Sequence, residues 1–205
     1  MDENFKYFLE KMGPAIEKRH VPASSVQRYR GRLPDQLLSY WEEQGWCGYA
    51  NGLFWTVDPE EYEPALEAWI GETPLMEQDA YHIIARSAFG KLYFWGEKTG
   101  GPFQLFAPGA FCVPAMGEPT ADMDFEMRIF FGTRKRKTDD FEDLFAPAMK
   151  ELGRLKHDEM YGFVPALALG GISTLAHLQK VQAVEHLVLL AQLAPLEVIA
   201  HPSQI

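Results

Sequence analysis

The chain has 205 residues, of which 47% are hydrophobic, and it carries a formal net charge of −10. This length and apolar content fit a folded protein with one large domain or two small ones, and they exclude general disorder. Because 29 acidic residues outnumber 19 basic ones, the electrostatic field disfavours nucleic acid as a partner and favours a basic protein.

The two cysteines do not form a metal-binding pattern, and the apolar segments do not form a membrane-spanning pattern. Cys47 and Cys112 have no CxxC partner, which is typical of reduced thiols in a cytoplasmic protein. The opening residues MDENFKYFLE begin with acids, whereas a signal peptide begins with bases. The most apolar tract, near the C-terminus, is interrupted by polar residues in an amphipathic pattern. We therefore expect a cytoplasmic protein with no metal, no cofactor and no membrane contact.

The first elements in chain order are two helices. Residues 4–19 predict a short helix broken by a Gly-Pro pair, because their aromatic and aliphatic side chains recur at helical spacing. Pro34 and Gly45 occupy positions typical of the start and the end of a second helix. The apolar residues between them would form the inner face of that helix.

Turn signals then predict strands separated by another helix. Asn51-Gly52 is a two-residue turn signal between aromatic runs and predicts a β-hairpin over residues 47–57. Asp58 is predicted to cap a helix that follows it directly. The aromatic-rich alternation of residues 80–97 predicts an antiparallel pair of strands.

The second half of the chain has a different pattern. Residues 103–124 are rich in Pro, Gly and Ala, which predicts a linker or a covering loop. Residues 124–133 are predicted to form a strand, and residues 140–152 a helix. Residues 173–193 carry one apolar stripe at helical spacing and predict a single long helix.

Tryptophan is confined to one part of the chain, since all five tryptophans lie between residues 41 and 95. This composition shift predicts two domains or lobes, residues 1–105 and 106–205, with the boundary in the stretch 103–124. The mixture of hairpins and helices predicts the α+β class. We expect antiparallel sheet with helices packed on one face.

The stretch HDEMYGFVPALALGG, residues 157–171, contains three adjacent titratable residues. His157, Asp158 and Glu159 could supply a metal ligand set or an acid–base group, but neighbouring residues rarely converge on one ion and no HExxH pattern accompanies them. A turn carboxylate that binds backbone amides fits better. Glu159 is the strongest candidate for that role, because it directly precedes an apolar run and a buried carboxylate needs hydrogen bonds.

The same stretch ends in a pair of glycines, Gly170-Gly171, before the predicted last helix. Such a pair could expose amides to an anion, but the spacing of a phosphate-binding loop is missing. Close packing at a helix start is the preferred interpretation. The basic run Arg134, Lys135, Arg136 and Lys137 also stays open, as either a solvated loop or a site for phosphates or an acidic partner.

Longer motifs resemble two known domains in a fixed order. The first half, with LPDQLLSYWEEQGWCGYANGLFW and ARSAFG, resembles the GAD-like domain. The later motif LGRLKHDEMYGFVPALALGG resembles the domain that follows it in immunity proteins of type VI secretion DNase effectors. The resemblance implies an antitoxin without chemistry of its own, which binds and neutralises a cognate secreted bacterial toxin. It also implies that residues 157–171 are a structural motif, whose key members would be Glu159, Tyr161, Phe163, Pro165, Gly170 and Gly171.

An acidic surface is the expected contact with such a toxin, whose DNA-binding cleft would be basic. Its predicted residues lie at the end of the second helix and the start of the third: Glu42, Glu43, Asp58, Glu60, Glu61 and Glu63. Within the same resemblance, Glu159 and Tyr161 could instead contact the toxin. Two other classes remain open, a regulatory or ligand-sensing interaction module, and an enzyme with a polar pocket. The pocket of the enzyme would contain His82, Arg86, His157 and Glu159.

Overall fold

The computed structural model describes residues 1–113 and 122–199. Its main feature is an eight-stranded sheet in the order β1-β2-β3-β4-β5-β6-β7-β10, antiparallel throughout except that β10 runs parallel to β7. A separate two-stranded antiparallel hairpin pairs β8 with β9. The strands span Ile16–Arg19 (β1), Trp46–Tyr49 (β2), Phe54–Thr56 (β3), Tyr81–Ser87 (β4), Lys91–Gly96 (β5), Gly100–Phe106 (β6), Phe111–Val113 (β7), Glu159–Phe163 (β8), Leu178–Gln182 (β9) and Glu197–Val198 (β10).

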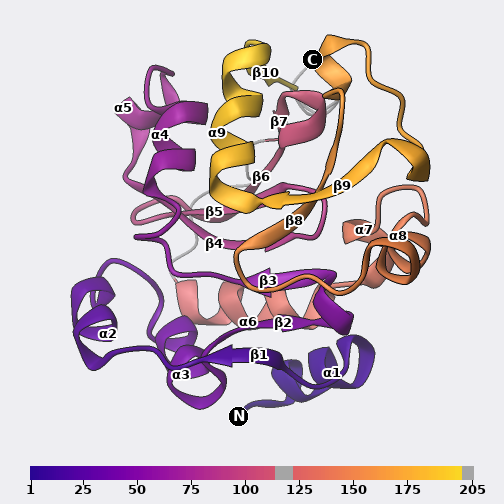
Figure 1. Cartoon of the computed structure of the whole chain (residues 1–205). Helices are drawn as coiled ribbons and strands as arrows, with labels where there is room; N and C mark the ends of the chain where they lie inside the picture. Colours follow the sequence, from indigo (N-terminus) through magenta and orange to yellow (C-terminus); the bar gives the residue numbers. More distant parts are fainter. Residues whose placement is uncertain (114–121, 200–205) are drawn as a thin grey trace.

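Helices surround this sheet, as Figure 1 shows. Short 3-10 turns lie between consecutive strands, at Ala50–Gly52 (η1), Ala107–Gly109 (η2), Leu167–Leu169 (η3) and Leu175–His177 (η4). The α-helices span Glu3–Met12 (α1), Ala23–Tyr29 (α2), Asp35–Gln44 (α3), Glu63–Ile70 (α4), Leu75–Gln78 (α5), Met123–Thr133 (α6), Arg136–Asp139 (α7), Phe145–Leu152 (α8) and Ala183–Leu193 (α9).

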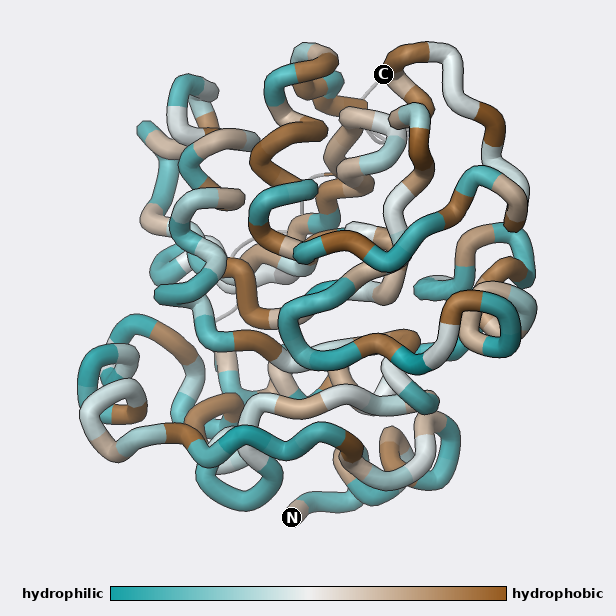
Figure 2. Tube along the Cα trace, in the orientation of Figure 1, coloured by the Kyte–Doolittle hydropathy of each residue, from teal (hydrophilic) through white to brown (hydrophobic). Residues whose placement is uncertain are grey.

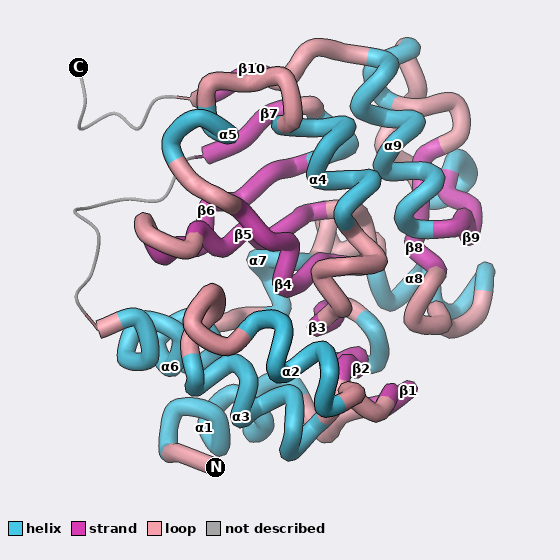
Figure 3. The backbone as a smooth tube through the Cα atoms, turned by 90° about the vertical axis from the view of Figure 1, so that its left-hand side faces the viewer, coloured by secondary structure: helices cyan, strands magenta, loops and turns pink. Residues whose placement is uncertain are grey.

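Aromatic side chains from α1 and α6 cover one face of the sheet. Phe8 of α1 lies 5.9 Å from Phe54 of β3, measured between ring centroids, and Phe130 of α6 lies 5.5 Å from Tyr93 of β5. Figure 3 shows α1, α3 and α6 together on this side and α4 and α9 on the other. Because adjacent strand residues point to opposite faces, Trp55 lies on the second face, where Arg86 stacks on it.

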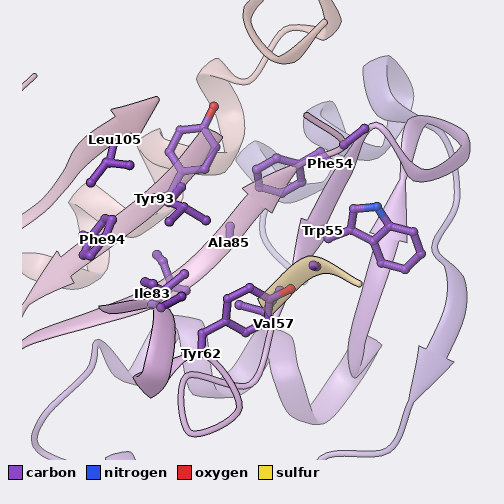
Figure 4. Close-up of a cluster of buried hydrophobic side chains, with 14 of the residues drawn as sticks. Phe54, Trp55, Val57, Tyr62, Ile83, Ala85, Tyr93, Phe94 and Leu105 are labelled. Carbon is purple, nitrogen blue, oxygen red and sulfur yellow. The ribbon is translucent and has the colours of Figure 1, made fainter. Parts of the chain in front are cut away.

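The buried side chains form a single cluster that extends from Phe5 of α1 to Leu190 of α9. Part of it, including Phe54, Trp55 and Tyr93, is drawn in Figure 4. Every residue of β2, β3 and β4 is buried, which is the pattern of strands covered on both faces. Both sequence halves therefore contribute to one hydrophobic core.

Several elements agree with the sequence predictions. The α+β class and the antiparallel sheet are confirmed, whereas helices cover both faces of the sheet and not one face as expected. The hairpin over 47–57 is present as β2 and β3, and the strand pair over 80–97 is present as β4 and β5. Asn51 and Gly52 both have positive φ, 61° and 97°, as a tight hairpin turn requires.

Three predictions for the second half are wrong. Residues 124–133 form the helix α6 and not a strand, because Met127, Phe130 and Phe131 make a buried helical face. The predicted helix 173–193 begins only at Ala183, and the residues before it pair with β8 as strand β9. The stretch 103–124 is not only a loop, since it contains the end of β6 and all of β7, while residues 114–121 lie outside the described residues.

Candidate functional site

The six acids expected at a partner surface lie close to the α2–α3 corner of the molecule. Five of them are exposed: Glu42 and Glu43 near the end of α3, Glu60 and Glu61 in the turn before α4, and Glu63 at the start of α4. The sixth, Asp58, is buried and only 8% exposed. Figure 3 shows α2 between α3 and α4 in that view.

Ion pairs within the chain already engage three of these acids. Arg19 donates two hydrogen bonds to the Glu61 carboxylate, at 2.8 and 2.6 Å. Arg28 pairs with Glu60, and the N-terminal ammonium pairs with Glu43 at 3.3 Å. Glu42 and Glu63 make no ion pair with any residue that the structure describes. The negative potential of this region is therefore partly compensated by Arg19, Arg28 and the N-terminal ammonium.

Asp58 has a local structural role. Its Oδ1 accepts a hydrogen bond from the backbone N–H of Glu60 at 3.1 Å, which shapes the turn before α4. Burial raises the pKa of Asp58 to about 6, the charge on Glu61 adds to this, and Arg19 and Arg28 oppose it. The regular helix that Asp58 was expected to cap directly begins later, at Glu63.

Two concave regions flank Arg32 in this part of the surface. One has a volume of about 570 Å³, and its lining includes Glu60, Glu63 and Glu67 together with apolar atoms of Leu66. The other has a volume of about 540 Å³, and its lining includes Glu42. Arg32 lines both regions. We call the combined region the acidic concave surface, defined by Arg32, Glu42, Glu60, Glu63, Glu67 and Glu97.

A hydrogen-bonded group lies at the centre of this surface. Glu97 Oε1 accepts from Arg32 Nε at 2.7 Å and lies 2.8 Å from His82 Nε2. Burial opposes ionisation of Glu97, but hydrogen bonds with His82 and Arg32 outweigh it and lower the pKa of Glu97. Since an ionised carboxylate only accepts, Nε2 of His82 carries the hydrogen. Burial in turn lowers the pKa of His82, which favours the neutral ring.

The stretch 157–171 is attached to the main sheet by Arg86. This side chain is fully buried, and its Nη2 donates to the carbonyl oxygens of His157 and Glu159, each at 2.8 Å. Its Nε donates to the Tyr62 hydroxyl at 2.7 Å, and the guanidinium lies over the Trp55 ring. Carbonyl, hydroxyl and ring partners thus replace the water that would otherwise solvate the guanidinium.

The expected motif residues of this stretch have mainly structural contacts. The Glu159 side chain accepts from the backbone N–H of Lys156 at 2.9 Å. Tyr161 is fully buried, and its hydroxyl donates to the carbonyl of Gly153 at 2.7 Å. Phe163 is also buried, whereas Pro165 is exposed. These contacts favour the fixed-turn interpretation over a toxin contact through Tyr161.

The two glycines of this stretch have different environments. Gly170 adopts a φ of +82° with open space around it. A Cβ on Gly171 would lie 2.0 Å from the carbonyl oxygen of Pro165. The close approach therefore involves the loop backbone and not the last helix. In Figure 2 hydrophobic residues mark this loop between β8 and β9, where Leu169 and Ile172 are 64% and 57% exposed.

The basic run 134–137 has one partly buried member, Arg134, and three exposed ones. The Arg134 guanidinium stacks over the rings of Tyr93 and Phe130, and its Nε donates to the Phe130 carbonyl at 3.1 Å. Lys135, Arg136 and Lys137 are exposed. Arg134 is thus part of the packing between α6 and the sheet, which the sequence pattern did not indicate.

The four residues of the enzyme alternative do not place their side chains together. His82 faces Glu97, while the Arg86 side chain reaches only the backbone oxygens of His157 and Glu159. The described part of the chain contains no group of three or more metal-ligating side chains. No helix within residues 1–113 and 122–199 has the length and apolar character needed to cross a membrane.

Sequence reasoning missed Arg32, Glu67 and Glu97 of the acidic concave surface. They lie in three separate segments of the chain, the α2–α3 turn, α4 and the β5–β6 turn, and converge only through the fold. The one local signal was the repeat of acids at positions 60, 63 and 67, which places Glu63 and Glu67 on one exposed side of α4.

Two family models match successive parts of the chain. The family model described as "GAD-like domain" matches residues 3–108, and the model described as "T6SS immunity protein Tdi1, C-terminal" matches residues 124–194. No curated protein matches the chain.

A solved structure shares the fold over nearly the whole length. The crystal structure of Atu4351 from Agrobacterium tumefaciens superposes with a TM-score of 0.86 at 21% sequence identity, covering 98% of this chain and 95% of that one. The order of the two family matches is the order that the sequence motifs predicted. This chain belongs to the GAD-like domain family, and its GAD-like domain is followed by the C-terminal domain of type VI secretion immunity proteins.

Proposed function

We propose that this protein is an immunity protein that binds and neutralises a cognate secreted toxin, with a type VI secretion nuclease as the expected target. The observation that carries the proposal is the match of residues 124–194 to the C-terminal domain of a type VI immunity protein. The protein acts by binding and not by catalysis, and it meets its toxin in the cytoplasm. The net charge of −10 supports a basic partner.

We further propose the acidic concave surface as the contact with the toxin. Its two concave regions offer space for side chains of the partner, and Glu42 and Glu63 are exposed without an internal ion pair among the described residues. The paired acids Glu60 and Glu61 can exchange their arginines for basic groups of the toxin. Long-range attraction would speed association, and partner side chains inserted beside Leu66 would slow dissociation.

The proposed function is tested by rescue of a sensitive host. The toxin encoded beside this gene is expressed with and without the protein, and the two proteins are then co-purified. The expected result is survival of the host and a stable one-to-one complex. If the host dies and the protein forms no complex with any secreted toxin that is encoded beside its gene, the immunity role is contradicted.

A matched pair of charge variants tests the surface. The first replaces five exposed acids by glutamine: Glu42, Glu60 and Glu63 of the acidic concave surface, and their sequence neighbours Glu43 and Glu61. The second removes five exposed charges elsewhere, by amide replacement at Glu10, Asp143, Glu151, Asp158 and Glu197. Both variants change the net charge from −10 to −5.

The two variants separate a local contact from a general charge effect. The first variant is expected to slow association with the toxin at least about tenfold and to flatten its dependence on salt. The second is expected to change association far less. Equal effects of the two variants on the association rate would remove this surface as the contact while leaving the immunity role in place.

A further inference from the structure

A second cavity lies between β5 and the segment that joins α7 to α8. Its volume is about 310 Å³, and it shares no lining residue with the acidic concave surface. Three aromatic rings form its apolar part, those of Phe89, Phe106 and Phe141. Phe141 stacks on Phe106 at 5.5 Å and lies 5.9 Å from Phe89. The remaining lining is polar and consists of Ser87, Thr138, Lys91 and three acidic residues, Asp139, Asp140 and Glu142.

Asp139 brings an incompletely satisfied carboxylate to this cavity. The side chain is only 4% exposed, and its Oδ1 accepts from the Tyr93 hydroxyl. Its Oδ2 makes no hydrogen bond with the described residues. The Thr138 hydroxyl lies near this carboxylate but donates to the carbonyl of Lys135 at 2.7 Å. A buried carboxylate oxygen without a donor is costly, so a ligand that supplies the donor would gain affinity.

Lys91 places an opposite charge at the same cavity. Its Nζ donates to the Thr138 carbonyl at 3.2 Å and retains further donor capacity. Lys91 and Asp139 interact electrostatically, yet no direct ion pair joins them within the described chain. Burial lowers the pKa of Lys91 and raises the pKa of Asp139, so each charge lacks a full solvation shell. The two groups are therefore separated charges at one small cavity.

We propose that this cavity binds a small zwitterion, an α-amino acid with an apolar side chain. Its ammonium would donate to Asp139 Oδ2, its carboxylate would accept from Lys91 Nζ, and its side chain would pack against the three phenylalanine rings. A ligand with only a positive charge would leave the Lys91 ammonium without a carboxylate partner, and one with only a negative charge would be repelled by the three acids Asp139, Asp140 and Glu142. The volume lies at the small end of the range of ligand pockets, which suits a single amino acid and not a peptide.

The test measures binding to the purified full-length protein by calorimetry. The probes are L-phenylalanine, L-leucine, L-methionine and L-tryptophan, together with two analogues of phenylalanine that each lack one charge, 2-phenylethylamine and 3-phenylpropionate. At least one of the four amino acids is expected to bind saturably. If phenylalanine binds, each single-charge analogue is expected to bind at least about tenfold more weakly, since a buried charged contact contributes more than 1.4 kcal/mol.

Two variants assign the charged contacts. Lys91→Met and Asp139→Asn are each expected to weaken binding at least about tenfold, whereas Lys150→Met on the exposed side of α8 is expected to leave it unchanged. Thermal unfolding checks that each variant is folded. If Asp139→Asn does not fold, the single-charge analogues and Lys91→Met still decide the outcome. No saturable binding of any of the four amino acids would overturn the proposal, and so would equal binding of the amino acid and its amine analogue.

Discussion

Arg86 and Glu159 are joined by a 2.8 Å hydrogen bond from Nη2 of the arginine to the carbonyl oxygen of the glutamate. Arg86 lies in β4, within the GAD-like match, and Glu159 begins β8, within the immunity-domain match. A second link lies beside it, where the N–H of Tyr161 donates to the carbonyl of Ala88 at 2.8 Å. A buried guanidinium thus connects the two family regions through the backbone of the second.

Replacing Arg86 by methionine is expected to destabilise the protein by roughly 3–5 kcal/mol, because the carbonyls of His157 and Glu159 and the Tyr62 hydroxyl lose their buried donor. Arg86→Lys is expected to recover little, since one ammonium cannot reproduce the planar set of donors. Urea unfolding measures both variants, with the exposed Arg154→Met as control. A loss below about 1 kcal/mol for Arg86→Met would mean that the buried guanidinium is dispensable.

Local signals predicted the parts of the fold in which neighbouring residues determine structure. Pro34 precedes α3 directly, and Gly45 ends it with a φ of +81°. Asn51 and Gly52 turn the β2–β3 hairpin in the left-handed conformations that these residue types tolerate. In each case one or two residues carry a strong conformational preference, so no distant contact is needed to predict the element.

Elsewhere the deciding contacts are distant in sequence. Phe125 and Ile129 of α6 are 52% and 38% exposed. Because these apolar residues point outward, the apolar residues of 124–133 do not recur at helical spacing alone, and the sequence resembled a strand. β9 forms because residues 178–182 pair with β8, which the local spacing does not show. The Lys91–Asp139 cavity was missed for the same reason, since Lys91 lies in β5 and Asp139 in α7.

We propose that the sequence units 1–105 and 106–205 unfold as one cooperative unit. The support is the single buried cluster together with the Arg86 link. All five tryptophans lie between residues 41 and 95, so tryptophan fluorescence reports on the first unit, whereas far-UV circular dichroism also reports on the helices of the second. The two signals are expected to give one coincident urea transition. Separate midpoints would show two independently stable domains.

The Asp58→Asn variant is expected to gain stability relative to the natural protein as the pH rises. Burial raises the pKa of Asp58 to about 6 from an ordinary value of 3.8, so the folded protein binds this proton more tightly than the unfolded chain. The favourable contribution of Asp58 is therefore complete below about pH 4 and is lost as the pH rises to about 6. Asparagine has no such loss and can still accept from the Glu60 N–H.

The difference in the free energy of unfolding between Asp58→Asn and the natural protein is expected to grow by roughly 1–2 kcal/mol between pH 4 and pH 7, because solvent screens part of the effect of burial. Urea unfolding at several pH values measures it. Glu63→Gln removes the same charge from an exposed position and controls for the change in net charge. A difference that stays constant with pH would show that Asp58 is not desolvated in the folded protein.

Gly170 and Gly171 provide a matched pair of alanine substitutions in one loop. At Gly171 the added Cβ would lie 2.0 Å from the Pro165 oxygen and 2.8 Å from the Ala166 oxygen, both in the backbone, so the loop must move. At Gly170 the surrounding space is open, and only the positive φ of 82° disfavours alanine. Gly171→Ala is therefore expected to lower the free energy of unfolding by more than about 2 kcal/mol, which is typical of overpacking. Gly170→Ala is expected to lower it by about 1 kcal/mol.

Thermal and urea unfolding measure this pair, and toxin binding measured on the same variants separates stability from recognition. Because the loop shares no residue with the acidic concave surface, both variants are expected to bind the toxin normally at temperatures where they are folded. Equal destabilisation by the two substitutions would show that backbone conformation, and not the close approach to Pro165, restricts position 171. Weaker toxin binding by folded Gly171→Ala would instead place the β8–β9 loop in the interface, where its exposed Leu169 and Ile172 would become the next positions to test.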